Sequence, residues 1–297
     1  MKNAIIAIVS TIVIGLALFT WVLNMENDPE TWTVTEYASV TGAQSMFYTI
    51  EDTQGRLVIV DGGYDADAEQ VRNVIAAYGN HVEDWIITHP HPDHVGAFNV
   101  IAAEPGDIVI DHLYSVDVNY ERYQETAQSY DGFESCETYF RVLENLDEST
   151  EIHYVGENDE FEMIGLKVKV LHGWDEEVDS LPDHLCNNGS MLFVVSGHTE
   201  KFLFCGDVQK EVEQGIIERH KDELDVDYVQ TGHHGNWGMT TDFYQYTTPK
   251  AVFFDSTDVL LEPGEIGYDG GELKAYFDGQ GAEFCNFTTA PNQITLQ

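Results

Sequence analysis

Four side chains that commonly bind metal ions stand within six residues of one another, in the segment Thr88-His89-Pro90-His91-Pro92-Asp93-His94. Imidazole nitrogens and a carboxylate suit zinc or another borderline divalent ion. His89 and His91 are two residues apart in an extended loop, so their rings can share one ion, while Asp93 and His94 face a second ion. Each proline fixes its own φ and favours an extended conformation in the residue before it, which stiffens the loop before metal binds. The segment therefore predicts a two-metal site.

The pattern His-x-His-x-Asp-His after a hydrophobic strand resembles the signature of the metallo-β-lactamase superfamily. Three more segments match that family in order: Asp61-Gly62-Gly63, Phe202-Leu203-Phe204-Cys205-Gly206-Asp207 and Gly232-His233-His234-Gly235. The resemblance implies that Asp207 bridges the two metals and that His233 binds the second ion, with His234 as the reserve ligand. It also implies that Asp61 supports the metal loop from behind.

Within the superfamily, the chain is most similar to the hydrolase domain of the competence DNA-uptake channel family and its free-standing relatives. The similarity rests on Asn187-Asn188-Gly189-Ser190-Met191-Leu192-Phe193, on the hairpin into Gly206-Asp207, on His233-His234-Gly235 and on the tail around residues 249–253 and 281–296. It covers roughly Trp32 to Gln297. The sequence contains no counterpart of the multi-spanning channel.

Two positions depart from the family pattern. The third histidine of the first metal site is replaced by Cys186, followed by Asn187. A thiolate can bind zinc, but His184 or a water could also complete the site, so this ligand stays open. His198 lies too close to Asp207 to supply it and is expected in an exposed turn. The region 260–268 lacks a further histidine that the subgroup often has, which weakens the expectation of the same substrate.

The expected cofactors are two divalent metal ions, Zn²⁺ in the first place and Mn²⁺ as the alternative. Such a pair lowers the pKa of a shared water toward neutrality and stabilises a developing oxyanion. Asp93 would orient the nucleophile while binding metal, and His234, if it is not a ligand, could donate to the leaving group. The resemblance favours a phosphoester or phosphodiester substrate. The alternatives are a carboxyl-ester, lactone or β-lactam hydrolase, and a non-catalytic binding module stabilised by metal.

The charge balance narrows the range of partners. Lys and Arg number 13 against 53 Asp and Glu, a formal net charge of −40. A broad groove for a nucleic-acid backbone needs clustered Lys and Arg, so long nucleic acid is not expected to be a substrate. A small or envelope-associated ester fits an acidic protein better.

The N-terminus differs in character from the rest of the chain. After Lys2, an apolar run over residues 4–23 is long enough to cross a bilayer core of about 30 Å as a helix. It lacks the short core and small-residue cleavage site of a signal peptide. Residues 1–25 are therefore predicted to be a transmembrane anchor, or a signal segment if cleaved. A linker (26–31) and one hydrolase domain (32–297) outside the cytoplasm would follow; cleavage would make the protein secreted.

The remaining pattern predicts one α/β (α+β) domain of two sheets covered by helices, and the resemblance implies that these form the αββα four-layer sandwich of the metallo-β-lactamase family. Expected strands lie at 33–39, 45–50, 57–60, 85–88, 108–110, 166–171, 191–195, 202–205, 228–230, 251–254 and 283–287, and expected helices at 71–78, 209–220, 240–246 and 271–279. The aromatic segment 116–146 is expected to be helical, either a lid over the site or an outer layer. Segments 157–162 and 175–179 read as solvated loops. His172 is expected to be a surface histidine at a strand end or a substrate-pocket histidine, and Cys205 and Cys285 to be buried free thiols.

Overall fold

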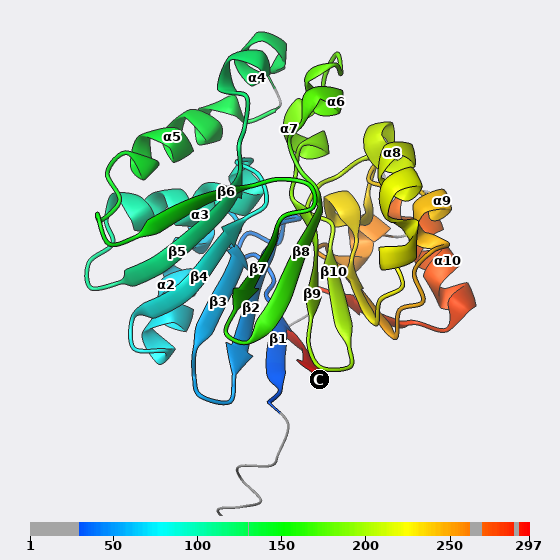
Figure 1. Cartoon of the computed structure of the whole chain (residues 1–297), viewed down its shortest axis with the longest axis horizontal. Helices are drawn as coiled ribbons and strands as arrows, with labels where there is room; N and C mark the ends of the chain where they lie inside the picture. Colours follow the sequence, from blue (N-terminus) through cyan, green and yellow to red (C-terminus); the bar gives the residue numbers. More distant parts are fainter. Residues whose placement is uncertain (1–29, 130, 262–268, 288–290) are drawn as a thin grey trace, which may run out of the picture.

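The computed structural model describes residues 30–129, 131–261, 269–287 and 291–297. Two seven-stranded sheets face each other, with helices on both outer sides (Figure 1). The first sheet has the order β14-β1-β2-β3-β4-β5-β6 and the second β13-β12-β11-β10-β9-β8-β7. This arrangement confirms the predicted four layers.

The strands of the first sheet are β1 (Trp32–Glu36), β2 (Phe47–Asp52), β3 (Leu57–Asp61), β4 (His81–Ile87), β5 (Val109–Val116), β6 (Glu151–Val155) and β14 (Asn292–Leu296). Those of the second sheet are β7 (Glu160–Met163), β8 (Leu166–His172), β9 (Leu192–Ser196), β10 (Lys201–Phe204), β11 (Tyr228–Gln230), β12 (Ala251–Phe254) and β13 (Glu283–Asn286). The α-helices are α2 (Ala68–Ala77), α3 (Pro92–Ala103), α4 (Tyr120–Thr126), α5 (Phe133–Leu143), α6 (Glu176–Asp179), α7 (Leu185–Asn188), α8 (Lys210–His220), α9 (Thr241–Tyr244) and α10 (Gly270–Gln280). Short 3-10 helices are η1 (Asp65–Asp67), η2 (Lys221–Glu223), η3 (Gly232–Gly235) and η4 (Asp258–Leu261).

Aromatic rings fill the space between the two sheets. Phe204 packs 4.2 Å from Phe202 and 5.0 Å from Phe193, measured between ring centroids, and Tyr48 of the opposite sheet meets Phe204 edge-on at 5.3 Å. All four side chains are fully buried. Burial of a side chain of this size contributes about 1.5–3 kcal/mol, so this layer holds the two sheets together under the site.

Helix α3 is the outer element that matters most for the site. Pro92 stands at its first position, where the missing N–H costs nothing, and the helix carries Asp93 and His94 in its first turn. Phe98 packs 5.1 Å from Trp85 of β4. Gly96 lies so close to the backbone of Tyr64 and Asp65 that a Cβ there would collide with it. The start of α3 is therefore fixed against both the sheet and the turn after β3.

Parallel pairing brings the loops of the site together. Strand β4 runs parallel to β3 and β5, and β10 runs parallel to β11, which is parallel to β12. The carboxyl ends of parallel strands meet at one edge of a sheet. The loops that follow β4, β10 and β11 are those that carry the predicted metal ligands.

Most expected elements are present, with two corrections. The segment 175–179 was expected to be a solvated loop, but residues 176–179 form the short helix α6, because the Asp175 side chain caps it by accepting from the Val178 amide. The segment 157–162 was expected to be a solvated loop, but residues 160–163 form β7 at the sheet edge. Glu160 and Glu162 are exposed, whereas Phe161 is half-buried and Met163 is buried, the alternation of a strand with one face inward. The dense negative charge conceals this period of two. Strands β6 and β14 were also not expected.

The predicted membrane anchor, residues 1–25, lies outside the described residues. Within the described ranges, no helix combines the length and apolar character needed to cross a membrane. All four cysteines are described, and each is a buried free thiol, as expected for Cys205 and Cys285.

Candidate metal centre

Metal-binding side chains from four loops gather at the carboxyl ends of the strands in two groups. The first group comprises His89, His91 and Cys186, and the second comprises Asp93, His94, Asp207 and His234. Within each group, one ligand atom per residue lies within 4.8 Å of all the others. Each group therefore has the size and the donor types of a site for one divalent ion.

Asp207 stands between the two groups, directly after β10. One carboxylate oxygen, Oδ1, lies 3.1 Å from His94 Nε2 and 3.5 Å from His234 Nε2. The other, Oδ2, lies 3.7 Å from His89 Nε2. The two oxygens therefore face different groups, which is the geometry that a bridging carboxylate needs.

Several buried ring nitrogens of these histidines lack a hydrogen-bond partner in the part of the chain that the structure describes and are therefore available to bind a metal ion. Among the described residues, Nε2 of His89, of His94 and of His234 and Oδ1 of Asp207 are buried and form no hydrogen bond of good geometry. Buried polar atoms are nearly always hydrogen-bonded, so a concentration of orphaned donor atoms indicates a missing partner. Divalent cations that accept several lone pairs at once supply that partner.

Asp61 holds the second group from behind. Its Oδ2 lies 2.7 Å from His94 Nδ1 and accepts a hydrogen bond of 2.7 Å from the Thr88 hydroxyl, and its Oδ1 accepts one from the Thr88 amide. The Trp85 indole donates to the Asp61 carbonyl. A carboxylate on one ring nitrogen fixes the histidine tautomer and directs the other nitrogen to a metal. Asp61 thus occupies the supporting position that the resemblance implied.

Tyr123 of α4 supports the first group. Its hydroxyl donates to the Asp131 carbonyl at 2.8 Å, lies 3.0 Å from His91 Nε2, and is close to the Cys186 thiol. The contact with His91 Nε2 leaves Nδ1 as the ring nitrogen that can bind an ion. Segment 116–146 therefore has two parts. Helix α4 supports His91 from behind through Tyr123, and Asp131 lines the pocket. Helix α5 packs against α3 as an outer layer through Tyr139 and Phe98.

The two histidines after β11 are placed in the reverse of the expected order. His234 is buried, with Nε2 at 3.2 Å from Asp93 Oδ2, and joins the second group. His233 is partly exposed, its Nδ1 bonded to the Asn236 carbonyl and its Nε2 at 3.8 Å from Asp207 Oδ2. Both residues have positive φ, 51° and 58°, a conformation that is costly for histidine and clusters at functional sites. The geometry favours His234 as the ligand and leaves His233 facing the pocket.

Cys186 occupies the position that the sequence left undecided, the third ligand of the first site. Cys186 lies with His89 and His91, whereas His184 and Asn187 line the pocket beside them. His172 is buried, and its Nε2 lies 2.7 Å from the Asn188 carbonyl. It is therefore neither a surface residue nor a member of the two groups, but it holds the turn that presents Cys186.

The surroundings of most of the candidate ligands hold them in the protonation state that binds a metal ion. Burial lowers the pKa of His89 well below its usual value and that of His91 to about 4, so both rings are neutral at pH 7. Burial alone would raise the pKa of Asp207, but the neighbouring histidines, His94 first, hold it well below the usual range. Burial raises the pKa of the Cys186 thiol, so a thiolate there depends on a bound cation.

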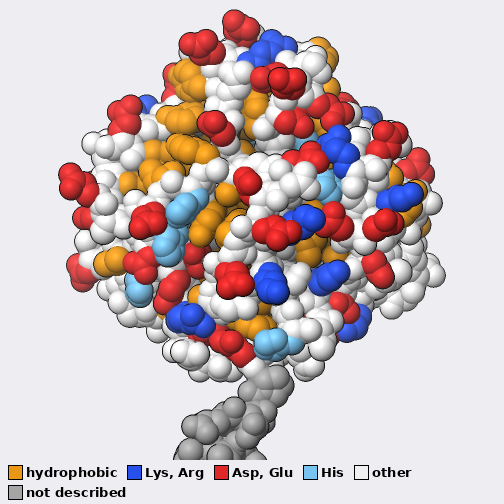
Figure 2. Space-filling model, in the orientation of Figure 1, with side chains coloured by type: hydrophobic (Ala, Val, Ile, Leu, Met, Phe, Trp, Pro, Cys, Tyr) orange, Lys and Arg blue, Asp and Glu red, His pale blue; other side chains and the backbone are white. Residues whose placement is uncertain are grey.

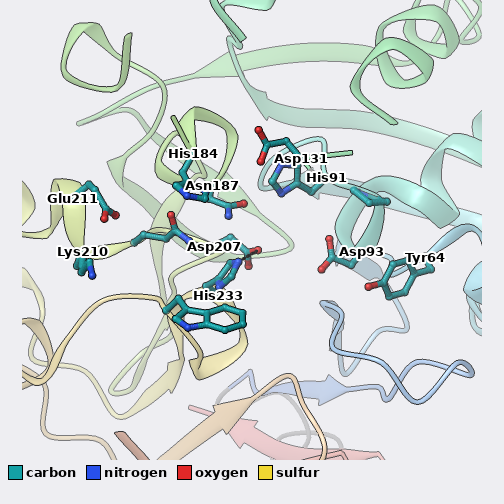
Figure 3. A pocket seen from close by; sticks show the side chains of 13 residues that line it. Tyr64, His91, Asp93, Asp131, His184, Asn187, Asp207, Lys210, Glu211 and His233 are labelled. Atoms are coloured by element: carbon teal, nitrogen blue, oxygen red, sulfur yellow. Dashed lines mark ion pairs between the residues drawn. The ribbon is translucent and has the colours of Figure 1, made fainter. Parts of the chain in front are cut away.

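A cavity of about 560 Å³ opens over the two groups. Figure 3 shows Asp207 and His233 at its centre, Lys210 and Glu211 on one side, and Asp93 with Tyr64 on the other. His184, Asn187, Asp131 and His91 form the remaining wall, and Trp237 also lines the cavity. The cavity is large enough for a small organic molecule.

Several residues of this site were not expected from the sequence. They are Tyr64, Tyr123, Asp131, Lys210, Trp237 and Asp255, the last with Oδ2 at 4.0 Å from His234 Nδ1. Tyr123 stood within an aromatic run that suggested a lid, and Asp255 follows a predicted strand, so their regions carried a signal. The individual contacts did not.

Comparison with known proteins agrees with this geometry. Residues 40–251 match the family described as the metallo-β-lactamase superfamily. No curated protein matches the chain.

Among solved structures, the metallo-β-lactamase fold protein YhfI from Bacillus subtilis is similar at TM-score 0.55 and 10% identity, over 90% of this chain and 99% of that one. A diphosphatase from the PhnP family is similar at TM-score 0.50 and 10% identity, over 90% and 98%. CmlA, a diiron β-hydroxylase from Streptomyces venezuelae, is similar at 0.52 and 13%, over 89% of this chain and 54% of CmlA.

These structural similarities, at such low identity, reflect a shared fold. The family match covers more than half of the chain and includes the His-rich loop, Asp207 and the His233-His234 pair. The chain belongs to the metallo-β-lactamase superfamily.

Proposed function

We propose that this protein is a dinuclear-metal hydrolase of phosphoesters or phosphodiesters. The observation that carries the proposal is the position of Asp207, whose two oxygens face the two donor groups. Two divalent ions bound there would supply Lewis acidity and an activated water. Zn²⁺ suits a donor set of imidazole, carboxylate and thiolate, and Mn²⁺ is the alternative.

The side chains around the pocket have distinct expected roles. Burial alone would raise the pKa of Asp93, but the contacts with His234 and His94 lower it to about 2. Asp93 is therefore ionised and would orient the nucleophile. Burial and the nearby Asp93 raise the pKa of Tyr64, so its hydroxyl stays protonated and can donate to a substrate oxygen. His233 faces the pocket without joining either group, which suits contact with the leaving group or the oxyanion.

The pocket itself favours a small substrate. Among the described residues that line it, Lys210 is the single Lys or Arg, set against Asp131 and Glu211. One cation can bind a phosphoryl oxygen that points away from the metals, but it cannot track a nucleic-acid backbone. A small phosphodiester or a phosphorylated envelope component fits this lining. The fold shared with a PhnP-family diphosphatase is consistent with phosphoester chemistry.

We further propose that the catalytic domain works outside the cytoplasm, attached to the membrane by its N-terminal segment. The apolar run over residues 4–23 and the flanking Lys2 support this proposal. We also propose the narrower relation to the competence DNA-uptake hydrolases, which is supported by the segments 187–193 and 233–235.

One experiment tests the chemistry. The full chain, purified in mild detergent and loaded with Zn²⁺ or Mn²⁺, is assayed with bis-p-nitrophenyl phosphate, p-nitrophenyl acetate and nitrocefin in parallel. Phosphodiester turnover that a chelator abolishes supports the proposal. Turnover of the carboxyl ester or the lactam alone would replace the substrate class, and metal binding without any turnover would favour a non-catalytic binding module.

A further inference from the structure

A second set of metal-binding side chains lies on the strands β5 and β6, outside the pocket. His112, Glu151 and His153 offer ligand atoms within 4.8 Å of one another. The strands pair in parallel, with His112 opposite Glu151 and Tyr114 opposite His153. Figure 2 shows histidine side chains among acidic ones on the side of the molecule that carries β4, β5 and β6. None of these residues takes part in the proposed hydrolysis.

His112 is oriented as a metal-binding histidine is. Its Nδ1 lies 3.2 Å from Asp84 Oδ1 and 3.2 Å from the Glu83 carbonyl. Asp84 is buried on the neighbouring strand β4, at only 4% exposure. With Nδ1 held there, Nε2 is the nitrogen that can bind an ion, the same carboxylate–histidine arrangement that Asp61 and His94 form in the candidate metal centre.

The ring of His153, on strand β6, gives separate support for a metal site. Its Nε2 is buried and has no hydrogen-bond partner among the described residues. The nearest carboxylate oxygen, Glu151 Oε2, is 3.7 Å away, too far for a hydrogen bond. The ring is held in place by stacking on Tyr114, which stacks in turn on Phe161 of β7. A nitrogen and an oxygen that face each other across such a gap can both bind one ion.

A neighbouring pair shows what these residue types do without a metal. His81 of β4 and Asp111 of β5 form a direct contact of 2.9 Å between Nε2 and Oδ2. His153 and Glu151 do not close to that distance. A direct histidine–carboxylate hydrogen bond therefore explains the contact between His81 and Asp111. It does not explain the wider separation between His153 and Glu151.

We propose that His112, Glu151 and His153 bind a third divalent transition-metal ion, of the Zn²⁺ class, with water completing the coordination. Two imidazoles and one carboxylate are donors that zinc accepts, and a site with three protein ligands leaves a position for water. The net charge of −40 raises the local concentration of cations. Because the ligands come from two adjacent strands, the ion would fasten the edge strand β6 to β5. This inference does not depend on the substrate or activity proposed above.

The test counts metals in the full chain. The detergent-purified protein is equilibrated with ZnSO₄ alone, passed through a desalting column, and analysed for zinc per chain. The wild type is expected to hold about three ions, against about two in His153→Ala and in Glu151→Gln. His81→Ala is the matched control and is expected to keep all three.

The difference between wild type and variant is the readout, so the result stands even if the catalytic pair binds incompletely. Circular dichroism spectra and melting curves of the zinc-free proteins check that each variant is folded. Glu151 is largely exposed, so Glu151→Gln keeps the test valid if His153→Ala does not fold. Equal zinc content in wild type, His153→Ala and Glu151→Gln would overturn the proposal. Loss of one ion in His81→Ala as well would also overturn it, because the effect would then be one of surface charge.

Discussion

The two donor groups of the metal centre differ in what stands behind them. In the second group, carboxylates face the histidines from behind: Asp61 contacts His94, and Asp255 approaches His234. In the first group, the supporting atom is a neutral phenol, the Tyr123 hydroxyl, which contacts both His91 and Cys186. A carboxylate increases the basicity of the ring that it contacts, whereas a phenol mainly orients it.

The supports also differ in where they come from. Asp61 ends β3, inside the first sheet, and Asp255 follows β12, inside the second. Tyr123 belongs to α4, a short helix outside the sheets that Figure 1 shows beyond the end of β6. We therefore expect the second group to hold its ion more tightly, and the first group to lose its ion first when metal is withdrawn.

The largest expected effect follows from removing the residue that both groups share. Asp207→Asn keeps the side-chain shape but removes the negative charge between the groups. Turnover is expected to fall about a thousandfold, equivalent to about 4 kcal/mol of transition-state stabilisation, and zinc content is expected to fall with it. Asp227→Asn, a change to an acid outside the centre, is the control. A variant that retains both ions and most of its turnover would show that Asp207 is not the bridge.

The next effect separates the two adjacent histidines. His234→Ala removes a donor from the second group and is expected to lower zinc content by about one ion per chain, with turnover near background. His233→Ala removes only a pocket side chain and is expected to keep its metal while turnover falls about 10–100-fold. Zinc analysis and steady-state kinetics on the same samples decide. The opposite pattern would restore His233 as the ligand, as the sequence alone had favoured.

The positions of His233 and His234, opposite to those expected, show what local sequence can and cannot predict. The ligands from His89 to His94 were identified because they are adjacent in one loop whose prolines restrict the backbone. The choice between His233 and His234 depends on two consecutive residues with positive φ, and no residue type except glycine signals that conformation reliably. Gly235 follows with φ 84° and lies against Phe254, where a Cβ would collide. The glycine was visible in the sequence, but the turn it permits was not.

The supporting residues were harder to predict for a different reason. Tyr123 contacts His91 across 32 positions of sequence, and Tyr48 contacts Asp255 across 207. Such contacts depend on sheet order and on where an inserted helix packs, which periodicity does not specify. The alternation of strands and helices indicated two sheets covered by helices, and the family resemblance implied the four layers, whereas β7 was hidden by its own charge.

The third effect compares the two supports directly. Asp61→Asn is expected to weaken zinc binding or turnover by about 10–100-fold, the usual cost of removing a carboxylate behind a metal-bound histidine. Tyr123→Phe removes one neutral hydroxyl and is expected to cost less than about tenfold, with its loss confined to one of the two ions. Competition with a chromogenic chelator measures both. If Tyr123→Phe costs more than Asp61→Asn, the ranking of the two supports is wrong.

The smallest effect concerns a buried acid cluster behind the second group. Glu36 lies between the sheets near Asp255, and the Tyr48 hydroxyl donates to Asp255 at 2.5 Å and lies 3.4 Å from Glu36 Oε1. Burial first, and then the charge of Asp255, raises the pKa of Glu36 well above its usual value. The folded protein therefore holds a proton that the unfolded chain releases at lower pH.

The sign of the pH dependence follows from this shift. A raised pKa gives stability that is fully present below the unfolded pKa, about 4.5, and is lost as pH rises through the folded pKa. Glu36→Gln mimics the protonated form, so its free energy of unfolding should fall less than that of the wild type as the pH rises above about 4.5. Urea unfolding with excess chelator measures this difference, and Glu272→Gln on the exposed face of α10 is the control. Parallel pH profiles for wild type and Glu36→Gln would mean that Glu36 stays ionised, and that the acids behind the second group carry two charges instead of one.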